Sequence, residues 1–156
     1  MRYSVTGGSE FRHPALVRVR LLSNYLQQLL GVIMNWFIGA LKKYATFSGR
    51  ARRAEYWYFF LFFILIFIGL SIIDGITGSF DTEAGVGLLG GLFFLVVFLP
   101  SLAVSVRRLH DTNRSGWWLL IGIIPLIGAI VLIVFAVQDS TSGDNSYGPN
   151  PKAAVI

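Results

Sequence analysis

Three long apolar runs without a charged residue constrain this chain more than any other feature of its sequence. They extend from Tyr56 to Ile73, from Val86 to Val106 and from Trp117 to Val137. At about 1.5 Å of rise per residue, roughly 20 helical residues cross the hydrocarbon core of a bilayer. We therefore predict an all-α integral membrane protein with three transmembrane helices, at about residues 56–76, 86–106 and 117–137.

The composition supports the same class. Of the 156 residues, 54% are hydrophobic and only 13% are charged, whereas soluble domains carry about 25% charged residues. A soluble domain this apolar would expose large patches and aggregate. The length suits a single membrane domain, at residues 34–152, followed by a short tail at 153–156. The chain has no cysteine, which excludes disulfides, thiol catalysis and thiolate metal sites.

The first 33 residues differ from the rest, because basic residues alternate there with a short amphipathic stretch that is too polar to span a membrane. The stretch Met34–Trp36 looks like a protein start. We predict that residues 1–33 are a misassigned or dispensable leader and that Met34 is the natural start. Residues 35–47 form a second amphipathic segment, which suits a short helix lying in the headgroup region. A first helix packed on the bundle explains this pattern equally well.

Several residues within the runs predict interfacial anchoring and helix packing. Trp57, Trp117 and Trp118 stand at the starts of runs, as in an interfacial aromatic belt. Gly87 and Gly91 have the G-x-x-x-G spacing that lets a second helix approach closely, although chance in a glycine-rich span gives the same spacing.

Two prolines predict bends. Pro100 should bend the second helix, and Ser101 or Ser105 could satisfy the freed backbone groups. Pro125 predicts a kink in the third run.

Positive charge alternates with the runs and predicts an orientation. The segment before the first run and the 107–116 loop are rich in Lys and Arg, whereas the 77–85 loop carries only acidic charges. The positive-inside rule places the N-terminal segment and the 107–116 loop in the cytoplasm, and the 77–85 loop and the C-terminal tail outside. A re-entrant third segment, broken at Pro125, would instead return the tail to the cytoplasm.

The two cytoplasmic segments would bring a polar cluster together. Arg107 and Asp111 are four residues apart and would share a helix face. Glu55, at the membrane boundary, requires an arginine partner, and we expect Arg107, Arg108 or Arg53. We predict a site for an anionic lipid head, or a structural network, while charges that only fix topology are the alternative. The candidate residues are Arg50, Arg52, Arg53, Glu55, Arg107, Arg108, His110, Asp111 and Arg114.

Other function classes find less support. An enzyme would use His110 and Asp111, but adjacent helical residues point about 100° apart, and no metal-ligand spacing is present, so we expect neither a cofactor nor a metal. An oligomeric small transporter or channel subunit is the first alternative, ahead of the enzyme, although the runs contain no ionisable residue. The expected partners are the bilayer with anionic phospholipid, and a second copy or another membrane protein. Nucleic acid is not expected, because the basic residues flank apolar runs.

The charged segments also carry a family resemblance, over about Met34 to Lys152. The chain resembles the YhaH-like family of small bacterial inner-membrane proteins, classed as a domain of unknown function (DUF 805). This resemblance implies a protein of the bacterial plasma membrane and implies no activity. The matching stretches are Met34–Trp36, Lys42–Arg53, Glu55–Trp57, Arg107–Asp111, Ser115–Trp118 and Gly143–Pro149.

Overall fold

A computed structural model describes residues 14–153. The chain divides into two compact units, Met1–Ile33 and Met34–Ile156, and helix α1 (Pro14–Lys42) contains the boundary. The side chains described in the first unit are almost all exposed. The boundary coincides with the start that we predict at Met34, although the start itself stays a prediction. Residues 1–13 of the predicted leader, and residues 154–156 of the tail, lie outside the described part.

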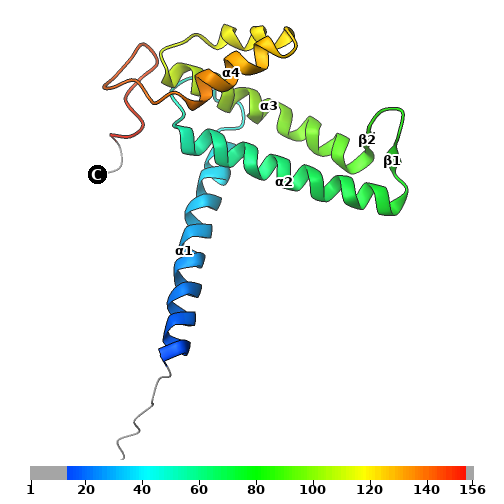
Figure 1. Ribbon diagram of the computed structural model, residues 1–156. Helices are drawn as coiled ribbons and strands as arrows, with labels where there is room; N and C mark the ends of the chain where they lie inside the picture. Colours follow the sequence, from blue (N-terminus) through cyan, green and yellow to red (C-terminus); the bar gives the residue numbers. More distant parts are fainter. Residues whose placement is uncertain (1–13, 154–156) are drawn as a thin grey trace, which may run out of the picture. The chain divides into compact units, whose positions relative to one another are not determined.

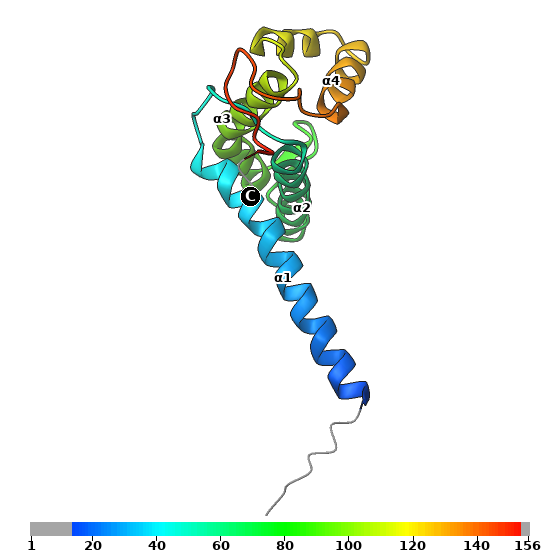
Figure 2. The same ribbon diagram turned by 90° about the vertical axis from the view of Figure 1, so that its left-hand side faces the viewer.

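The second unit is built on two long helices. They are α2 (Arg53–Thr77) and α3 (Leu88–Asp111), joined by the short strands β1 (Phe80–Asp81) and β2 (Val86–Gly87). The strands pair antiparallel, Phe80 opposite Gly87 and Asp81 opposite Val86. Figures 1 and 2 show α2 and α3 side by side. The predicted all-α class is confirmed, and these two helices are long and apolar enough to cross a membrane.

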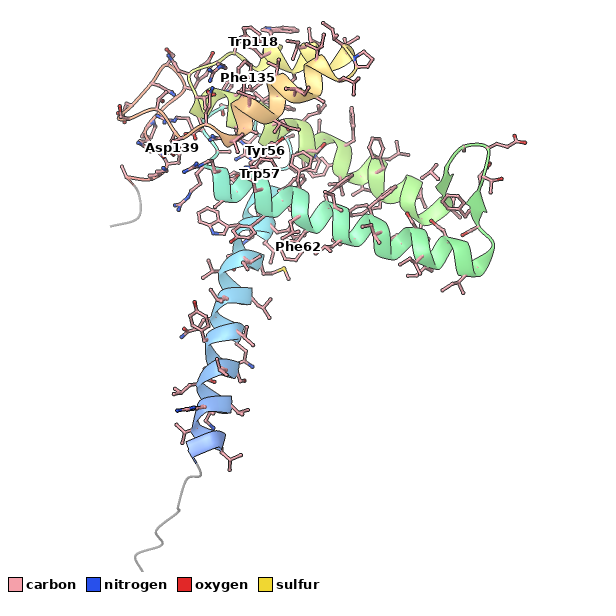
Figure 3. The ribbon with its side chains drawn as sticks, in the orientation of Figure 1. Tyr56, Trp57, Phe62, Trp118, Phe135 and Asp139 are labelled. Carbon is pink, nitrogen blue, oxygen red and sulfur yellow. The ribbon has the colours of Figure 1, made fainter. Side chains whose placement is uncertain are left out.

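Many large apolar side chains of α2 and α3 are exposed (Figure 3). Within the most apolar 18-residue window of each helix, only 11% of α2 and 28% of α3 is buried. Ile76 is 81% exposed and Leu95 70%. The core helix of a soluble protein would instead be mostly buried. This exposed apolar surface therefore fits helices that lipid surrounds.

The buried core is small and mostly aromatic. Phe37, at the end of α1, lies with its ring centre 5.9 Å from that of Phe59 and 4.9 Å from that of Phe62. Ala40 is fully buried beside them. The apolar face of the 35–47 segment thus packs on α2, as our packing alternative expected. Its location in the headgroup region stays a prediction.

The third apolar run is not one helix. It forms a 3-10 helix, η1 (Gly116–Ile123), and a short helix, α4 (Ile127–Val137), with a break at Pro125 and Leu126, whose φ is 62°. The two pieces pack on each other: Trp118 meets Phe135 edge-on at 5.4 Å (Figure 3). A Cβ on Gly128 would lie 1.9 Å from the Ile121 carbonyl oxygen, so only glycine permits this approach. The prediction of one helix at 117–137 is therefore wrong, because the chain reverses at the proline.

Pro100 lies inside α3, and the carbonyl that it frees has another partner than we predict. A proline frees the carbonyl four residues earlier, which here belongs to Val96. The Tyr44 hydroxyl donates to that oxygen at 2.9 Å. Ser101 and Ser105 bond instead to the carbonyls of Phe98 and Ser101. The prediction that a serine satisfies the freed group is therefore wrong, and Tyr44 fastens the segment after α1 to α3.

Asp74, near the end of α2, holds the first turn of α3. Its carboxylate is fully buried and accepts from the backbone amides of Leu89 at 3.1 Å and Gly90 at 2.9 Å, and from the Ser79 hydroxyl at 2.7 Å. Amides at a helix N-terminus lack partners within the helix and attract negative charge. Asp74 therefore caps α3 from the neighbouring helix.

The same contact explains one glycine of the G-x-x-x-G pair. A Cβ on Gly87 would meet the Asp74 carboxylate at 2.2 Å, whereas a Cβ on Gly91 has nothing within 4 Å. Among residues 14–153, α2 therefore approaches Gly87 through the Asp74 side chain, and no element approaches Gly91. A close approach by another molecule at Gly91 stays a prediction.

We expect Gly87→Ala to lower the stability of the purified protein, because the added methyl must displace the Asp74 carboxylate. Overpacking of this kind costs about 1–3 kcal/mol. Gly91→Ala is the matched control and should change little. Thermal unfolding in detergent measures both. Equal loss in the two variants would instead support G-x-x-x-G packing between molecules.

Candidate functional site

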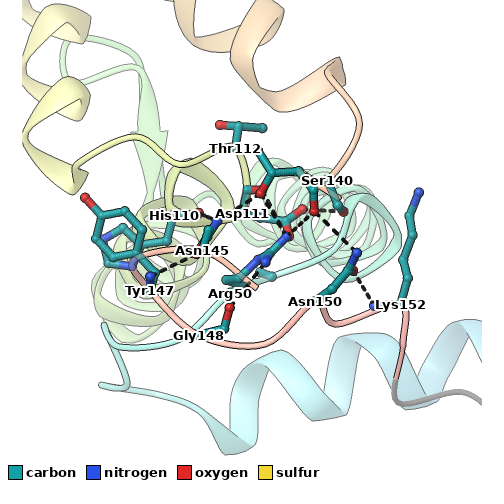
Figure 4. Close-up of polar contacts among 12 residues, drawn as sticks. Arg50, His110, Asp111, Thr112, Ser140, Asn145, Tyr147, Gly148, Asn150 and Lys152 are labelled. Atoms are coloured by element: carbon teal, nitrogen blue, oxygen red, sulfur yellow. Dashed lines mark hydrogen bonds and ion pairs between the residues drawn. The ribbon is translucent and has the colours of Figure 1, made fainter. Parts of the chain in front are cut away.

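A buried carboxylate, Asp111, lies at the centre of the polar cluster (Figure 4). Asp111 has no exposed surface and is the last residue of α3. Its side chain accepts from Arg50 Nε at 3.0 Å, from the Ser140 hydroxyl at 2.6 Å and from Arg108 Nη1. The acidic partner of Arg108 is thus three residues away on the same helix. The predicted pairing of Arg107 with Asp111 is wrong, because Arg107 turns to another acid.

Arg50 connects this centre to the C-terminal tail. Its side chain is 1% exposed. Besides Asp111, it donates to the carbonyls of Gly143 at 2.8 Å, Gly148 at 3.3 Å and Thr141 at 2.8 Å. The tail therefore folds around a guanidinium that the 43–52 segment supplies.

Arg108 connects the same centre to the end of α4. Its Nε donates to the Ala136 carbonyl at 3.1 Å, and its Nη2 donates to the Gln138 carbonyl. Its Nη1 also reaches the Ala51 carbonyl at 3.2 Å. The last carbonyls of a helix lack partners within the helix, and a cation is favourable there. Arg108 thus caps α4 while Asp111 balances its charge.

Glu55 and Arg107 form a second buried pair. Glu55 is 5% exposed and Arg107 is 1% exposed, and Arg107 Nη1 donates to the Glu55 carboxylate. Lys43 Nζ lies 3.5 Å from the same oxygen. The expected arginine partner of Glu55 is therefore Arg107. Among the described residues, no acceptor reaches the buried Nε and Nη2 of Arg107.

The remaining arginines lie nearer the surface, on aromatic rings or at the tail. The guanidinium of Arg52 lies 4.5 Å from the centre of the Trp36 ring, and that of Arg114 lies 4.1 Å from the Phe135 ring. Arg53, 45% exposed, contacts Asp139 at 3.4 Å. A hydrogen bond from Lys152, aided by the Ser140 amide and the charge of Arg53, holds the pKa of Asp139 below its usual value. Asp139 therefore stays ionised at neutral pH and keeps the two cations at the tail.

The structure separates His110 from Asp111. His110 Nδ1 lies 3.2 Å from the Gly49 carbonyl oxygen, and its ring stacks on Tyr147 with centres 3.8 Å apart (Figure 4). Because a carbonyl only accepts, Nδ1 is the protonated nitrogen. Asp111 faces Arg50 and Arg108 instead, so this pair does not form a catalytic relay. No group of three potential metal ligands occurs among residues 14–153.

The sequence reading missed the contribution of the tail. Thr141 donates from its amide to the Asp111 carbonyl at 3.0 Å, and Asn145 donates to the His110 carbonyl at 2.8 Å. The signal in the sequence that corresponds to these contacts is the polar stretch Gly143–Pro149, which matches the family but predicts no contact by itself. The three tryptophans that we predict as interfacial anchors are all exposed: Trp57 is 41% exposed, Trp117 78% and Trp118 46%. Their depth in a membrane stays a prediction.

These contacts also correct the placement of the tail. We place the 107–116 loop in the cytoplasm and the tail outside, yet the tail bonds directly to Arg50, His110 and Asp111. Segments that share hydrogen bonds cannot lie on opposite faces of a membrane. The prediction of opposite sides is therefore wrong, because the third run reverses instead of crossing as one helix.

We expect Asp111→Asn to destabilise the protein by about 3–5 kcal/mol, because it leaves two buried guanidiniums without a counter-charge. The exposed Asp139→Asn, which also removes a carboxylate bonded to two cations, should cost far less. Thermal unfolding in detergent compares them. Similar losses in both variants would contradict a structural role for the buried network.

Comparison with known proteins places the chain in a family. The profile of a family described as "Protein of unknown function (DUF805)" matches residues 44–149. The inner membrane protein YhaH of Escherichia coli (strain K12) is 46% identical over 76% of this chain and 98% of that protein. The inner membrane protein YhaI of the same organism is 45% identical over 76% of this chain and 97% of that protein. No solved structure matches. The chain is a membrane protein that belongs to the DUF805 family, whose function is unknown.

Proposed function

We propose that this is a non-enzymatic inner-membrane protein that binds anionic phospholipid heads on its cytoplasmic side. The part that faces the cytoplasm is the arginine-rich end, which comprises residues 43–55, residues 107–116 and the tail. In this proposal α2 and α3 cross the bilayer, whereas η1 and α4 form a hairpin that enters the cytoplasmic leaflet and returns. The observation that carries the proposal is that the arginines form two groups. Arg50, Arg107 and Arg108 are buried and bond to other parts of the fold. Arg52 and Arg114 lie nearer the surface on aromatic rings.

Charge and length support this topology. Helix α4 has 11 residues and therefore spans about 16 Å, roughly half of the hydrocarbon thickness. Both ends of the hairpin lie beside cations, since Arg114 precedes η1 and Arg108 caps α4. The 77–85 loop, at the other end of α2 and α3, carries Asp81 and Glu83 and no basic residue. The positive-inside rule then favours a cytoplasmic position for the arginine-rich end together with the tail.

The absence of native cysteine makes this topology testable by labelling. We expect a membrane-impermeant maleimide, applied to intact spheroplasts, to label Glu83→Cys. The tail variant Ser142→Cys should react only after permeabilisation, as should Thr46→Cys, the cytoplasmic reference. All three positions are exposed in the structure. Labelling of Ser142→Cys from outside would overturn the re-entrant hairpin.

The surface cations favour lipid heads for a chemical reason. Arg52 lies on Trp36 and Arg114 on Phe135, and such pairs suit the membrane interface, where tryptophan also concentrates. Lys42, the last residue of α1, and Lys43, which follows it, are also exposed. Arg50, Arg107 and Arg108 are buried and so take no part in the proposed contact.

We expect the triple variant Arg52→Gln/Arg53→Gln/Arg114→Gln to lose most of the preference for anionic lipid. Each contacting cation contributes about 1 kcal/mol, which is roughly fivefold in preference. The measurement is the ratio of phosphatidylglycerol to phosphatidylethanolamine that native mass spectrometry finds on protein extracted from mixed vesicles. Arg18→Gln/Arg20→Gln, on the exposed helix of the first unit, is the control for lost charge. An unchanged ratio in the triple variant would contradict the proposal.

A further inference from the structure

A groove runs between α3 and the 3-10 helix η1, with a volume of about 450 Å³. One wall is formed by Leu102, Val106 and His110, which follow one another at intervals of four residues along a single face of α3. The opposite wall comes from η1, where Trp117 and Leu120 are the most exposed lining residues, and Phe47 completes the lining. The volume lies within the range of about 300–1,000 Å³ usual for small-molecule sites.

The groove is apolar along most of its length and polar at one end. Leu102, Val106 and His110 span about 12 Å of helix, so the groove leads from the arginine-rich end toward the middle of α3. Among residues 14–153, His110 is the ionisable residue that lines the groove, and Ser115 and the indole of Trp117 add polar groups. The Ser115 hydroxyl already accepts from the Trp117 amide. His110 gives its Nδ1 to Gly49 and a ring face to Tyr147, which leaves Nε2 for a polar ligand.

The groove opens onto an exposed apolar surface, which would face lipid in the proposed hairpin. Trp117 is 78% exposed and Leu120 is 56% exposed, and both also line the groove. Ile123, further along η1, is 77% exposed. A hydrocarbon chain can therefore enter sideways from the bilayer without meeting water. If the groove were empty, its lining would lose dispersion contacts that a chain supplies.

We propose that this groove holds one acyl chain of a phospholipid from the leaflet at the arginine-rich end. The inference rests on the proposed entry of the hairpin into that leaflet. No carboxylate of the described residues lines the groove, so none of them repels the negative phosphate of the lipid, and Arg114 lies next to Ser115 in the sequence. The chain fills the apolar part, and a donor of the head, such as a hydroxyl or ammonium, meets Nε2 of His110. In this arrangement lipid forms part of the packing between η1 and α3.

The experiment fills the groove with a larger side chain. The protein is reconstituted in vesicles of phosphatidylethanolamine and phosphatidylglycerol, extracted in mild detergent and measured by native mass spectrometry. We expect one retained phospholipid on the unchanged protein and at least a roughly tenfold weaker retention in Leu102→Trp. Leu95→Trp, on the same helix but 70% exposed and outside the groove, is the matched control and should retain the lipid. Equal retention in both variants, or none in the unchanged protein, would overturn the proposal.

A second measurement covers the case in which Leu102→Trp does not fold. The unchanged protein is photolabelled in vesicles with a phospholipid that carries a diazirine in its acyl chain. Adducts concentrated on Leu102, Val106 and Leu120 support the groove, whereas adducts spread evenly over the exposed residues of α2 and α3 overturn it.

Vesicles of phosphatidylethanolamine alone separate this inference from the proposed head-group binding. Retention there, with no preference for phosphatidylglycerol, leaves the groove standing and removes the anionic head site. A preference for phosphatidylglycerol together with even photolabelling supports the anionic head site and overturns the groove. Labelling of Ser142→Cys from outside would remove the hairpin on which both rest.

Discussion

The buried carboxylate of Asp111 is the interaction on which the arginine-rich end depends. The carboxylate accepts hydrogen bonds from the side chains of Arg50, Arg108 and Ser140. The backbone carbonyl of Asp111 accepts one from the amide of Thr141 in the tail. Two guanidiniums with almost no exposed surface are costly to bury unless their charge is balanced and their donors are used. Their remaining donors go to backbone carbonyls of the tail and of α4. A single side chain thereby links segments that are far apart in the sequence.

Asp74 has the corresponding role at the other end of α2 and α3. Between the two acids the helices meet through aromatic and aliphatic side chains, such as Phe63 and Phe93 with ring centres 5.6 Å apart. In lipid, apolar contacts of this kind gain little from the hydrophobic effect, because the surroundings are equally apolar. Polar contacts at the two ends are directional, and a shift of α3 along α2 would break the bonds from Leu89 and Gly90 to Asp74. The register of the pair is therefore set mainly at its ends.

The parts of the fold that the sequence predicted correctly are those that follow from local composition. An uncharged run such as Tyr56–Ile73 requires a helix in lipid, because every backbone group must find a partner within the segment. Glu55 at a membrane boundary requires a cation, and Arg107 supplies it. Of the predicted polar cluster, the structure brings Arg50 to Asp111, whereas Arg52 and Arg114 lie on aromatic rings. The lipid site that we predict there stays a prediction. The pairing of Asp111 was not predicted correctly, because Arg107 and Arg108 are neighbours that point to different acids.

What the sequence could not predict depends on contacts over long distances along the chain. The run Trp117–Val137 is long enough to cross a bilayer, and hydropathy does not distinguish a crossing from a hairpin. The difference lies in Gly128, which admits the Ile121 carbonyl, and in Arg108, which reaches back to cap α4. Charge counting also treats all arginines alike. Here Arg50, Arg107 and Arg108 are buried in the fold, whereas Arg52, Arg53 and Arg114 lie nearer the surface. Within the fold the three buried arginines have different roles, since Arg50 holds the tail, Arg108 holds the end of α4 and Arg107 joins α3 to α2 through Glu55.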